Sequence, residues 1–68
     1  MRLEVFGKQL LVERYQHQWR VWSLGEGTRR PADDLVVPVD ITQKEMPEYL
    51  ADLCHEWSRP GADTVQIL

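Results

Sequence analysis

The two most reactive side chains of this 68-residue protein, Cys54 and His55, are adjacent in the sequence. Neighbouring residues of a helix point about 100° apart, so they cannot act together as a nucleophile and its base. The other histidine, His17, lies in a polar stretch far away in the sequence. Two histidines and one cysteine, so widely separated, are too few for the three or four ligands of a zinc site. We therefore expect no metal site and interpret Cys54 as a packed side chain.

The carboxylates also lack the setting of catalytic groups. A carboxyl that works as a general acid needs an apolar pocket to raise its pKa, whereas Asp33 and Asp34 are neighbours in a predicted loop. Most of the later acids follow the polar side of a predicted helix. The glycines form no phosphate-binding fingerprint, since they stand at Gly7, Gly25, Gly27 and Gly61. We expect a protein that is not an enzyme and that has no cofactor and no small-molecule ligand.

The side chains that could bind a partner are aromatic and basic. Four arginines and four rings gather in the first half of the chain: Arg14, Arg20, Arg29, Arg30, Phe6, Tyr15, Trp19 and Trp22. Rings on a sheet with cations around them bind single-stranded nucleic acid, but Trp, Tyr and Arg are also the enriched anchors of protein interfaces. The net charge of −3 favours the protein interface, because nucleic-acid binders usually have a basic excess.

An amphipathic helix predicted over residues 42–57 must support these side chains. Its apolar residues recur at helical spacing: Met46, Tyr49, Leu50, Leu53, Cys54 and Trp57. Thr42 and Glu45 match a capping box at its start. Pro47 is awkward at the fifth position, because its ring would crowd the preceding turn. We expect either a distorted first turn or a regular helix that begins closer to Pro47.

Residues 3–14 predict a β-hairpin with Gly7 and Lys8 in a two-residue type II′ turn. This register pairs Val5 with Leu10. Because side chains alternate between the faces of a strand, one face is then apolar: Leu3, Val5, Leu10 and Val12. The other face is mixed and contains Arg2, Glu4, Phe6, Leu11 and Glu13.

A third strand is predicted over residues 18–24, after a polar break. If the connection has an even number of residues, Val21 faces Val12, and Arg20 lies opposite an acid of the preceding strand. The residues that then point away from the helix are Phe6, Leu11, Trp22 and Leu24. A connection with an odd number of residues would exchange the two faces.

The rest of the chain completes one α+β domain over residues 1–61. Residues 25–34 predict a turn and a loop, and residues 35–39 a fourth strand that Pro38 ends or confines to an edge. Residues 62–68 form either a frayed tail or a short edge strand. The predicted fold is a three- or four-stranded, mostly antiparallel sheet in the order β-β-β-(β)-α, with the helix packed on one face.

Cysteine content and hydropathy indicate the compartment. One cysteine allows no internal disulfide, although small secreted chains usually depend on several. The N-terminus lacks the apolar core of a signal peptide, and no apolar run approaches the ~20 residues of a membrane span. We expect a cytoplasmic protein that does not contact a membrane.

One helix of about 15 residues spans only about 22 Å and cannot cover both faces of the sheet. We hypothesise that the uncovered face docks on another protein or on a second copy, as in a homodimer. The candidate surface is Phe6, Leu11, Arg20, Trp22, Leu24, Arg29 and Arg30. The alternative is a module that binds single-stranded nucleic acid through the arginines and aromatic rings of the sheet.

Several short stretches resemble a family of short bacterial proteins of unknown function. They are Val5-Phe6-Gly7-Lys8, Leu11-Val12-Glu13-Arg14, Trp19-Arg20-Val21, Tyr49-Leu50-Ala51-Asp52-Leu53 and His55-Glu56-Trp57. The resemblance extends from about Leu3 to Pro60 and implies a bacterial, cytoplasmic setting. It implies no activity, cofactor or catalytic residue.

Overall fold

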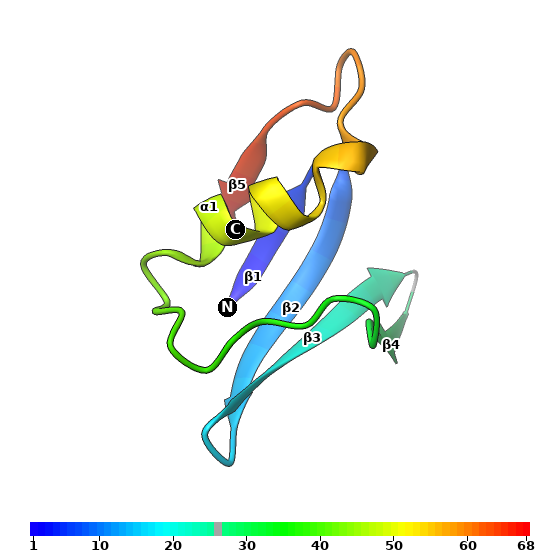
Figure 1. Ribbon diagram of the computed structural model, residues 1–68. Coiled ribbons are helices and arrows are strands. Elements are labelled where there is room, and N and C mark those ends of the chain that lie inside the picture. The colour runs from blue at the N-terminus through cyan, green and yellow to red at the C-terminus, as the bar shows by residue number, and fades with distance from the viewer. Residues whose placement is uncertain (26) are drawn as a thin grey trace.

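The computed structural model describes residues 1–25 and 27–68 and combines one antiparallel sheet with one α-helix. The elements in chain order are β1 (Arg2–Val5), β2 (Lys8–Tyr15), β3 (Gln18–Gly25), β4 (Thr28–Pro31), α1 (Met46–Leu53), the 3-10 helix η1 (His55–Trp57) and β5 (Val65–Ile67). In space the strands follow the order β4-β3-β2-β1-β5 (Figure 1). The α+β class is therefore confirmed, but the sheet has five strands rather than three or four.

The first hairpin turns one residue earlier than predicted. Phe6 and Gly7 are its central residues, with φ of 50° and 84°, and positive φ at both positions is the requirement of a type I′ turn. Val5 consequently pairs with Lys8 and not with Leu10. The reason is the Phe6 ring: in the turn it reaches the core and is only 6% exposed. The shift in pairing is two residues, so the division into faces is unchanged.

The second hairpin has the predicted register. Gln16 and His17 form its two-residue connection, again with positive φ at both positions, so the connection is even. Val12 pairs with Val21, and Arg20 lies opposite its predicted acidic partner on β2. Trp22 and Leu24 consequently point to the opposite face from Val21.

One face of the sheet is covered by two parts of the chain (Figure 1). The helix α1 packs over β1 and β5, and residues 32–45, the crossing segment, pass over β2 and β3 on the same side. Between these layers lies the core, whose buried side chains are Leu3, Val5, Phe6, Leu10, Val12, Val21, Val37, Met46, Leu50 and Cys54.

Three side-chain donors fix the crossing segment to the layers on either side of it. The Trp19 indole Nε1–H donates to the carbonyl of Ile41 at 2.8 Å, and the Arg14 guanidinium donates to the carbonyl of Val39 at 3.2 Å. From α1, the hydroxyl of Tyr49 donates to a further carbonyl of the segment at 3.0 Å. These bonds satisfy the carbonyls of a segment that has no strand partner.

The prediction of a fourth strand over residues 35–39 is wrong. Residues 35–39 lie in the crossing segment and form no strand, while β4 is built from Thr28–Pro31, which was predicted as loop. A tight hairpin after β3 places Thr28–Pro31 at the free edge with little loop-closure entropy. Pro38 has no N–H to contribute to a ladder, and Val37 instead buries its side chain against the sheet.

The helix is shorter than predicted, and its N-cap is Glu45 rather than Thr42. The hydrogen bonds of the predicted capping box form in the turn before the helix. The Glu45 carboxylate accepts the backbone N–H of Thr42 at 3.1 Å, and the Thr42 hydroxyl accepts the backbone N–H of Glu45 at 3.2 Å. The Thr42 backbone N–H, and the Thr42 hydroxyl, which donates to the same carboxylate at 2.9 Å, lower the pKa of the Glu45 carboxyl. Regular helix starts at Met46, directly before Pro47. Leu53, placed in the buried stripe by its spacing, is 40% exposed.

The C-terminal residues, for which the sequence left a frayed tail or an edge strand open, form β5. It pairs antiparallel with β1, with Leu3 opposite Ile67. Backbone bonds extend this pairing at both ends, from Phe6 N–H to the Thr64 carbonyl and from Leu68 N–H to the Arg2 carbonyl.

We expect Leu50→Ala to remove most of the stability of the fold. Leu50 is fully buried, and such a truncation costs about 2–5 kcal/mol, whereas a chain of this length has roughly 3–10 kcal/mol in total. Leu53→Ala on the same helix is the matched control, because Leu53 is 40% exposed. Urea unfolding followed by tryptophan fluorescence measures both. Equal losses in the two variants would contradict the described packing of α1.

Candidate interaction surfaces

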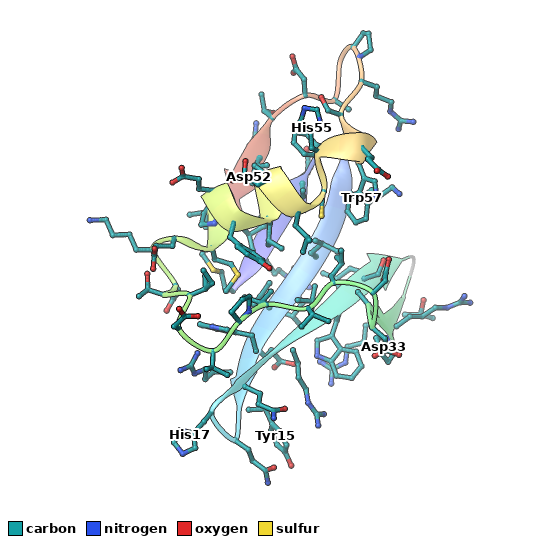
Figure 2. The ribbon with its side chains drawn as sticks, in the orientation of Figure 1. Tyr15, His17, Asp33, Asp52, His55 and Trp57 are labelled. Atoms are coloured by element: carbon teal, nitrogen blue, oxygen red, sulfur yellow. The ribbon has the colours of Figure 1, made fainter. Side chains whose placement is uncertain are left out.

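Cys54, His17 and His55 do not come together as a catalytic or metal-binding site. Cys54 is buried, and burial, assisted by the negative charge of Asp34, raises the pKa of its thiol. A thiol of this kind is a poor nucleophile. His17 lies at the tip of the β2–β3 hairpin, and His55 lies at the other end of the molecule, in η1 (Figure 2). Among the described residues no three His, Cys, Asp or Glu side chains gather as metal ligands would.

The face of the sheet opposite α1 has no covering element in the part of the chain that the structure describes. We call this surface the open face. The strand registers place these side chains on it: Arg2 and Glu4 from β1, Gln9, Leu11, Glu13 and Tyr15 from β2, Arg20, Trp22 and Leu24 from β3, and Arg29 and Pro31 from β4. Its centre is apolar, and arginines and glutamates surround that centre.

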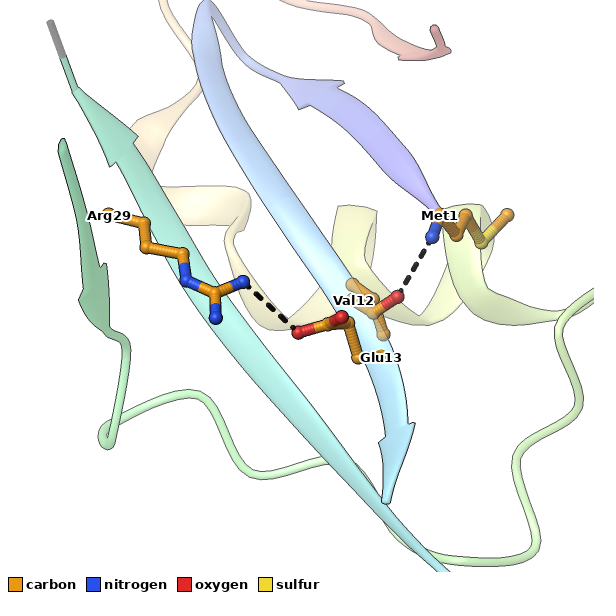
Figure 3. Close-up of polar contacts among 4 residues, drawn as sticks. All are labelled: Met1, Val12, Glu13 and Arg29. Atoms are coloured by element: carbon orange, nitrogen blue, oxygen red, sulfur yellow. Dashed lines mark hydrogen bonds and ion pairs between the residues drawn. The ribbon is translucent and has the colours of Figure 1, made fainter. Parts of the chain in front are cut away.

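Trp22 lies near the centre of the open face beneath a side chain of the neighbouring strand. The guanidinium of Arg29 lies 4.4 Å from the centroid of its ring. The same guanidinium reaches across β3 to the Glu13 carboxylate at 3.4 Å (Figure 3). Both members of this ion pair are about half exposed, so it contributes less than about 1 kcal/mol. Trp22 is therefore half-buried by a contact that a partner can displace at little cost.

The structure brings five of the seven predicted surface residues together. Leu11, Arg20, Trp22, Leu24 and Arg29 all lie on the open face.

The other two predicted residues lie elsewhere. Phe6 was expected to face away from the helix, but its place in the turn buries it in the core. Arg30 pairs with Ser23, so it points to the face of β4 opposite that of Arg29. The sequence placed Arg30 on the surface because its strand was predicted as loop, where alternation gives no direction.

Four cations lie over aromatic rings of the same chain: Lys8 over Trp57, Arg14 over Trp19, Arg20 over Tyr15 and Arg29 over Trp22, at 4.2–4.6 Å from the centroids. Three of the arginines proposed to bind a partner therefore lie on aromatic rings of their own chain. Each such contact is worth about 0.5–1 kcal/mol at an exposed site. A nucleic-acid base that stacked on one of these faces would first have to displace the cation.

Charge is divided unequally between the sheet-forming half and the rest of the chain. Residues 1–31 contain six bases and three acids, and residues 32–68 contain two bases and eight acids. The crossing segment and α1 therefore form an acidic side, while the open face carries both signs.

A cleft of about 400 Å³ lies at the edge of the sheet where β4 ends. Four consecutive residues of β3 line one wall, from Trp19 to Trp22, and the opposite side is formed by Pro31, Asp33, Leu35 and Val36. Consecutive strand residues alternate between faces, so a cavity that all four line must run along the edge of β3. This cleft was not predicted, because it depends on where β4 stops.

Trp22, one of the residues that line this cleft, has an unsatisfied polar atom. Its indole Nε1 is buried and has no hydrogen-bond acceptor among the described residues. A buried donor without a partner costs about 1–3 kcal/mol. The other cleft tryptophan is satisfied, because Trp19 donates to the crossing segment.

These features define a small α+β domain whose five-stranded antiparallel sheet is covered on one face. No helix among the described residues is both long and apolar enough to cross a membrane. The chain belongs to the family described as Domain of unknown function (DUF7661), whose model matches residues 1–68. No curated protein and no solved structure matches it.

We expect the amide of Trp19 to exchange with solvent faster than those of Arg20 and Trp22. The Val21 carbonyl accepts Ala32 N–H on the β4 side, so by strand alternation the Trp19 amide points to that side too. β4 pairs with β3 only from Trp22 to Gly25. The amides of Arg20 and Trp22 point to β2 and are bonded there. Hydrogen exchange read by NMR measures all three, and equal protection would show that the β3 edge is closed.

Proposed function

We propose that this protein is an interaction module that self-associates through the open face. The observation that carries the proposal is the half-buried apolar cluster of Leu11, Trp22 and Leu24 on a sheet face that the described chain leaves uncovered. Apolar clusters ringed by polar side chains are typical of protein interfaces. Trp and Arg are enriched in such interfaces; Trp22 lies in this cluster, and Arg20 and Arg29 lie beside it.

A second copy fits this face because its charges are self-complementary. The open face carries three arginines, Arg2, Arg20 and Arg29, and two glutamates, Glu4 and Glu13. In a two-fold contact each residue that meets another is met in return, so every arginine–glutamate contact occurs twice. A strongly single-signed face would repel its own copy.

The size of the face limits the strength of the contact. Five strands about 4.8 Å apart, the longest with eight residues at about 3.3 Å each, give a footprint of at most roughly 600 Å². A standard interface buries about 800 Å² per partner. We therefore propose a weak, reversible dimer that forms at micromolar or higher concentration.

Binding of single-stranded nucleic acid is the second candidate function. The excess of bases over acids in residues 1–31 supports it, and the cations that already occupy the ring faces count against it. The two candidates differ in their response to salt, because nucleic-acid binding weakens steeply as salt rises.

A bacterial origin and a cytoplasmic location belong to the same proposal. The resemblance of the short sequence stretches supports the origin. The single, buried Cys54 supports a reducing compartment, where free thiols persist.

We expect Leu24→Glu to convert the dimer into a folded monomer. The new carboxylate would lie in the apolar centre of the contact, where desolvation of a charge is costly. Leu53→Glu is the matched control, since Leu53 is exposed on α1 and lies on the covered side. Sedimentation equilibrium over a range of concentrations measures both masses, and circular dichroism checks the fold.

A wild-type protein that stays monomeric up to millimolar concentration would contradict self-association. If the wild type instead binds a fluorescent oligothymidine with a steep salt dependence, the second candidate function replaces the first. A dimer that both glutamate variants weaken equally would place the contact elsewhere.

A further inference from the structure

We propose that the free edge of β5 is a second self-association site, at which β5 of another copy adds as an antiparallel strand around a two-fold axis at Gln66. This site is distinct from the open face and does not depend on it, because it lies along an edge of the sheet and uses backbone groups.

Backbone geometry determines which groups of β5 are free. The carbonyl of Thr64 and the N–H of Leu68 are both bonded to β1. Because the backbone groups of an antiparallel strand turn to alternate sides, those of Gln66 also face β1, whereas those of Val65 and Ile67 face outward. β5 is the last strand in the order of the sheet, so these outward N–H and C=O groups have no strand partner among the described residues.

A second β5 strand matches these outward groups when the two copies of Gln66 lie opposite each other. Val65 of each copy then faces Ile67 of the other, and such a pair exchanges both of its N–H···O bonds. The two Gln66 residues form the non-hydrogen-bonded pair between them, in which side chains lie closest. Each side-chain amide can donate and accept, so the pair at the axis is also self-complementary.

The apolar side chains of β5 match in the same register. Ile67 lies opposite Leu3 and therefore on the covered side of the sheet, yet its side chain is 62% exposed. Directly opposite residues share a face, so Ile67 would pack against Val65 of the second copy. The contact thus removes from water an apolar side chain that the single chain leaves exposed.

Charge distinguishes this edge from the opposite edge of the sheet. β4 carries Arg29, Arg30 and Pro31, and charged residues and proline are the usual means of preventing strand addition at an edge. Residues 64–68 contain no charged side chain and no proline. The nearest acid along the chain, Asp63, would lie about 20 Å from its copy at ~3.3 Å per residue. A second copy is therefore accepted at β5 and repelled at β4.

The acids of α1 do not oppose this contact. Glu45, Glu48 and Asp52 line a hollow together with Ile41 of the crossing segment. α1 packs over β1 and β5, and the crossing segment lies on the β2 side of it (Figure 1). Two copies joined at β5 consequently keep these carboxylates on their outer flanks.

The edge contact is weaker than the contact of the open face, because β5 has only three residues and spans about 10 Å. We expect a dissociation constant of roughly 1 mM. Leu24→Glu is therefore a monomer at micromolar concentration and pairs through β5 only near millimolar concentration. In the wild type, the two separate contacts allow dimers formed through the open face to associate further.

Disulfide trapping tests the site and its register, in the Leu24→Glu background so that the open face does not contribute. Gln66→Cys places two thiols in the non-hydrogen-bonded pair, where the Cα atoms are about 4.5 Å apart and within disulfide range. Ile67→Cys is the matched control, because the two copies of position 67 are diagonal neighbours about 7–8 Å apart. We expect Gln66→Cys to form the covalent dimer at least tenfold faster in a glutathione buffer at millimolar protein. The natural Cys54 is buried and does not compete.

A proline substitution tests the role of the backbone. Ile67→Pro removes an outward N–H and leaves the bonds to β1 in place, as is typical of proline in edge strands. In Leu24→Glu, we expect the Val65 amide to shift in NMR spectra and to exchange at least tenfold more slowly between micromolar and millimolar samples. Ile67→Pro should abolish both changes, and circular dichroism checks that it folds.

Equal trapping rates for Gln66→Cys and Ile67→Cys would overturn the proposal. So would a Val65 amide that behaves identically in dilute and concentrated samples, and the edge would then be left to a strand of a different protein. A wild type that is monomeric at micromolar concentration, together with rapid trapping through Gln66→Cys, would contradict the open-face dimer and support the edge contact.

Discussion

The register that two short hairpins impose on β1, β2 and β3 decides which side chains the protein buries. Each hairpin turns on two residues with positive φ, and such turns fix the pairing of the strands that they join. Because the side-chain period of a strand is two, that pairing places Leu3, Leu10 and Val21 on one face. It places Leu11, Trp22 and Leu24 on the other. A one-residue slip in either hairpin would expose the core and bury the arginines.

The remaining chain is sufficient to cover only one of these faces. The crossing segment is held by donors from Trp19 and Arg14 below and from Tyr49 above, and α1 contributes Met46 and Leu50 to the core. No described element covers the opposite face, where the guanidinium groups of Arg20 and Arg29 lie over the rings of Tyr15 and Trp22. A chain of 68 residues has a small core and a thin stability margin. Burial of the open face by a second copy would therefore stabilise the fold by mass action.

The fold class, the second hairpin and the Thr42–Glu45 hydrogen bonds could be predicted because each depends on local chemistry: alternation of apolar and polar residues, a polar turn with an even number of residues, and the capping-box sequence. The fourth strand could not. Leu35–Val39 has the composition of a strand, but its place is decided by tertiary bonds from Trp19 and Tyr49, which sequence periodicity does not contain. Phe6 shows the same limit, since a buried aromatic residue is an unusual choice for a turn with positive φ. Leu11, Arg20, Trp22 and Leu24 followed from register alone, whereas the directions of Arg29 and Arg30 required the observed pairing of β4. The cleft required the observed end of β4.

The most direct test is the accessibility of leucine methyl groups to a soluble gadolinium chelate, compared in dilute and concentrated samples by NMR. The account predicts that Leu11 and Leu24 relax strongly in the dilute sample and become protected in the concentrated one, while Leu3 and Leu10 are protected in both. Two results would contradict this account. Protection of Leu11 at every dilution would mean that the monomer covers this face itself, and exposure at every concentration would mean that no second copy binds there.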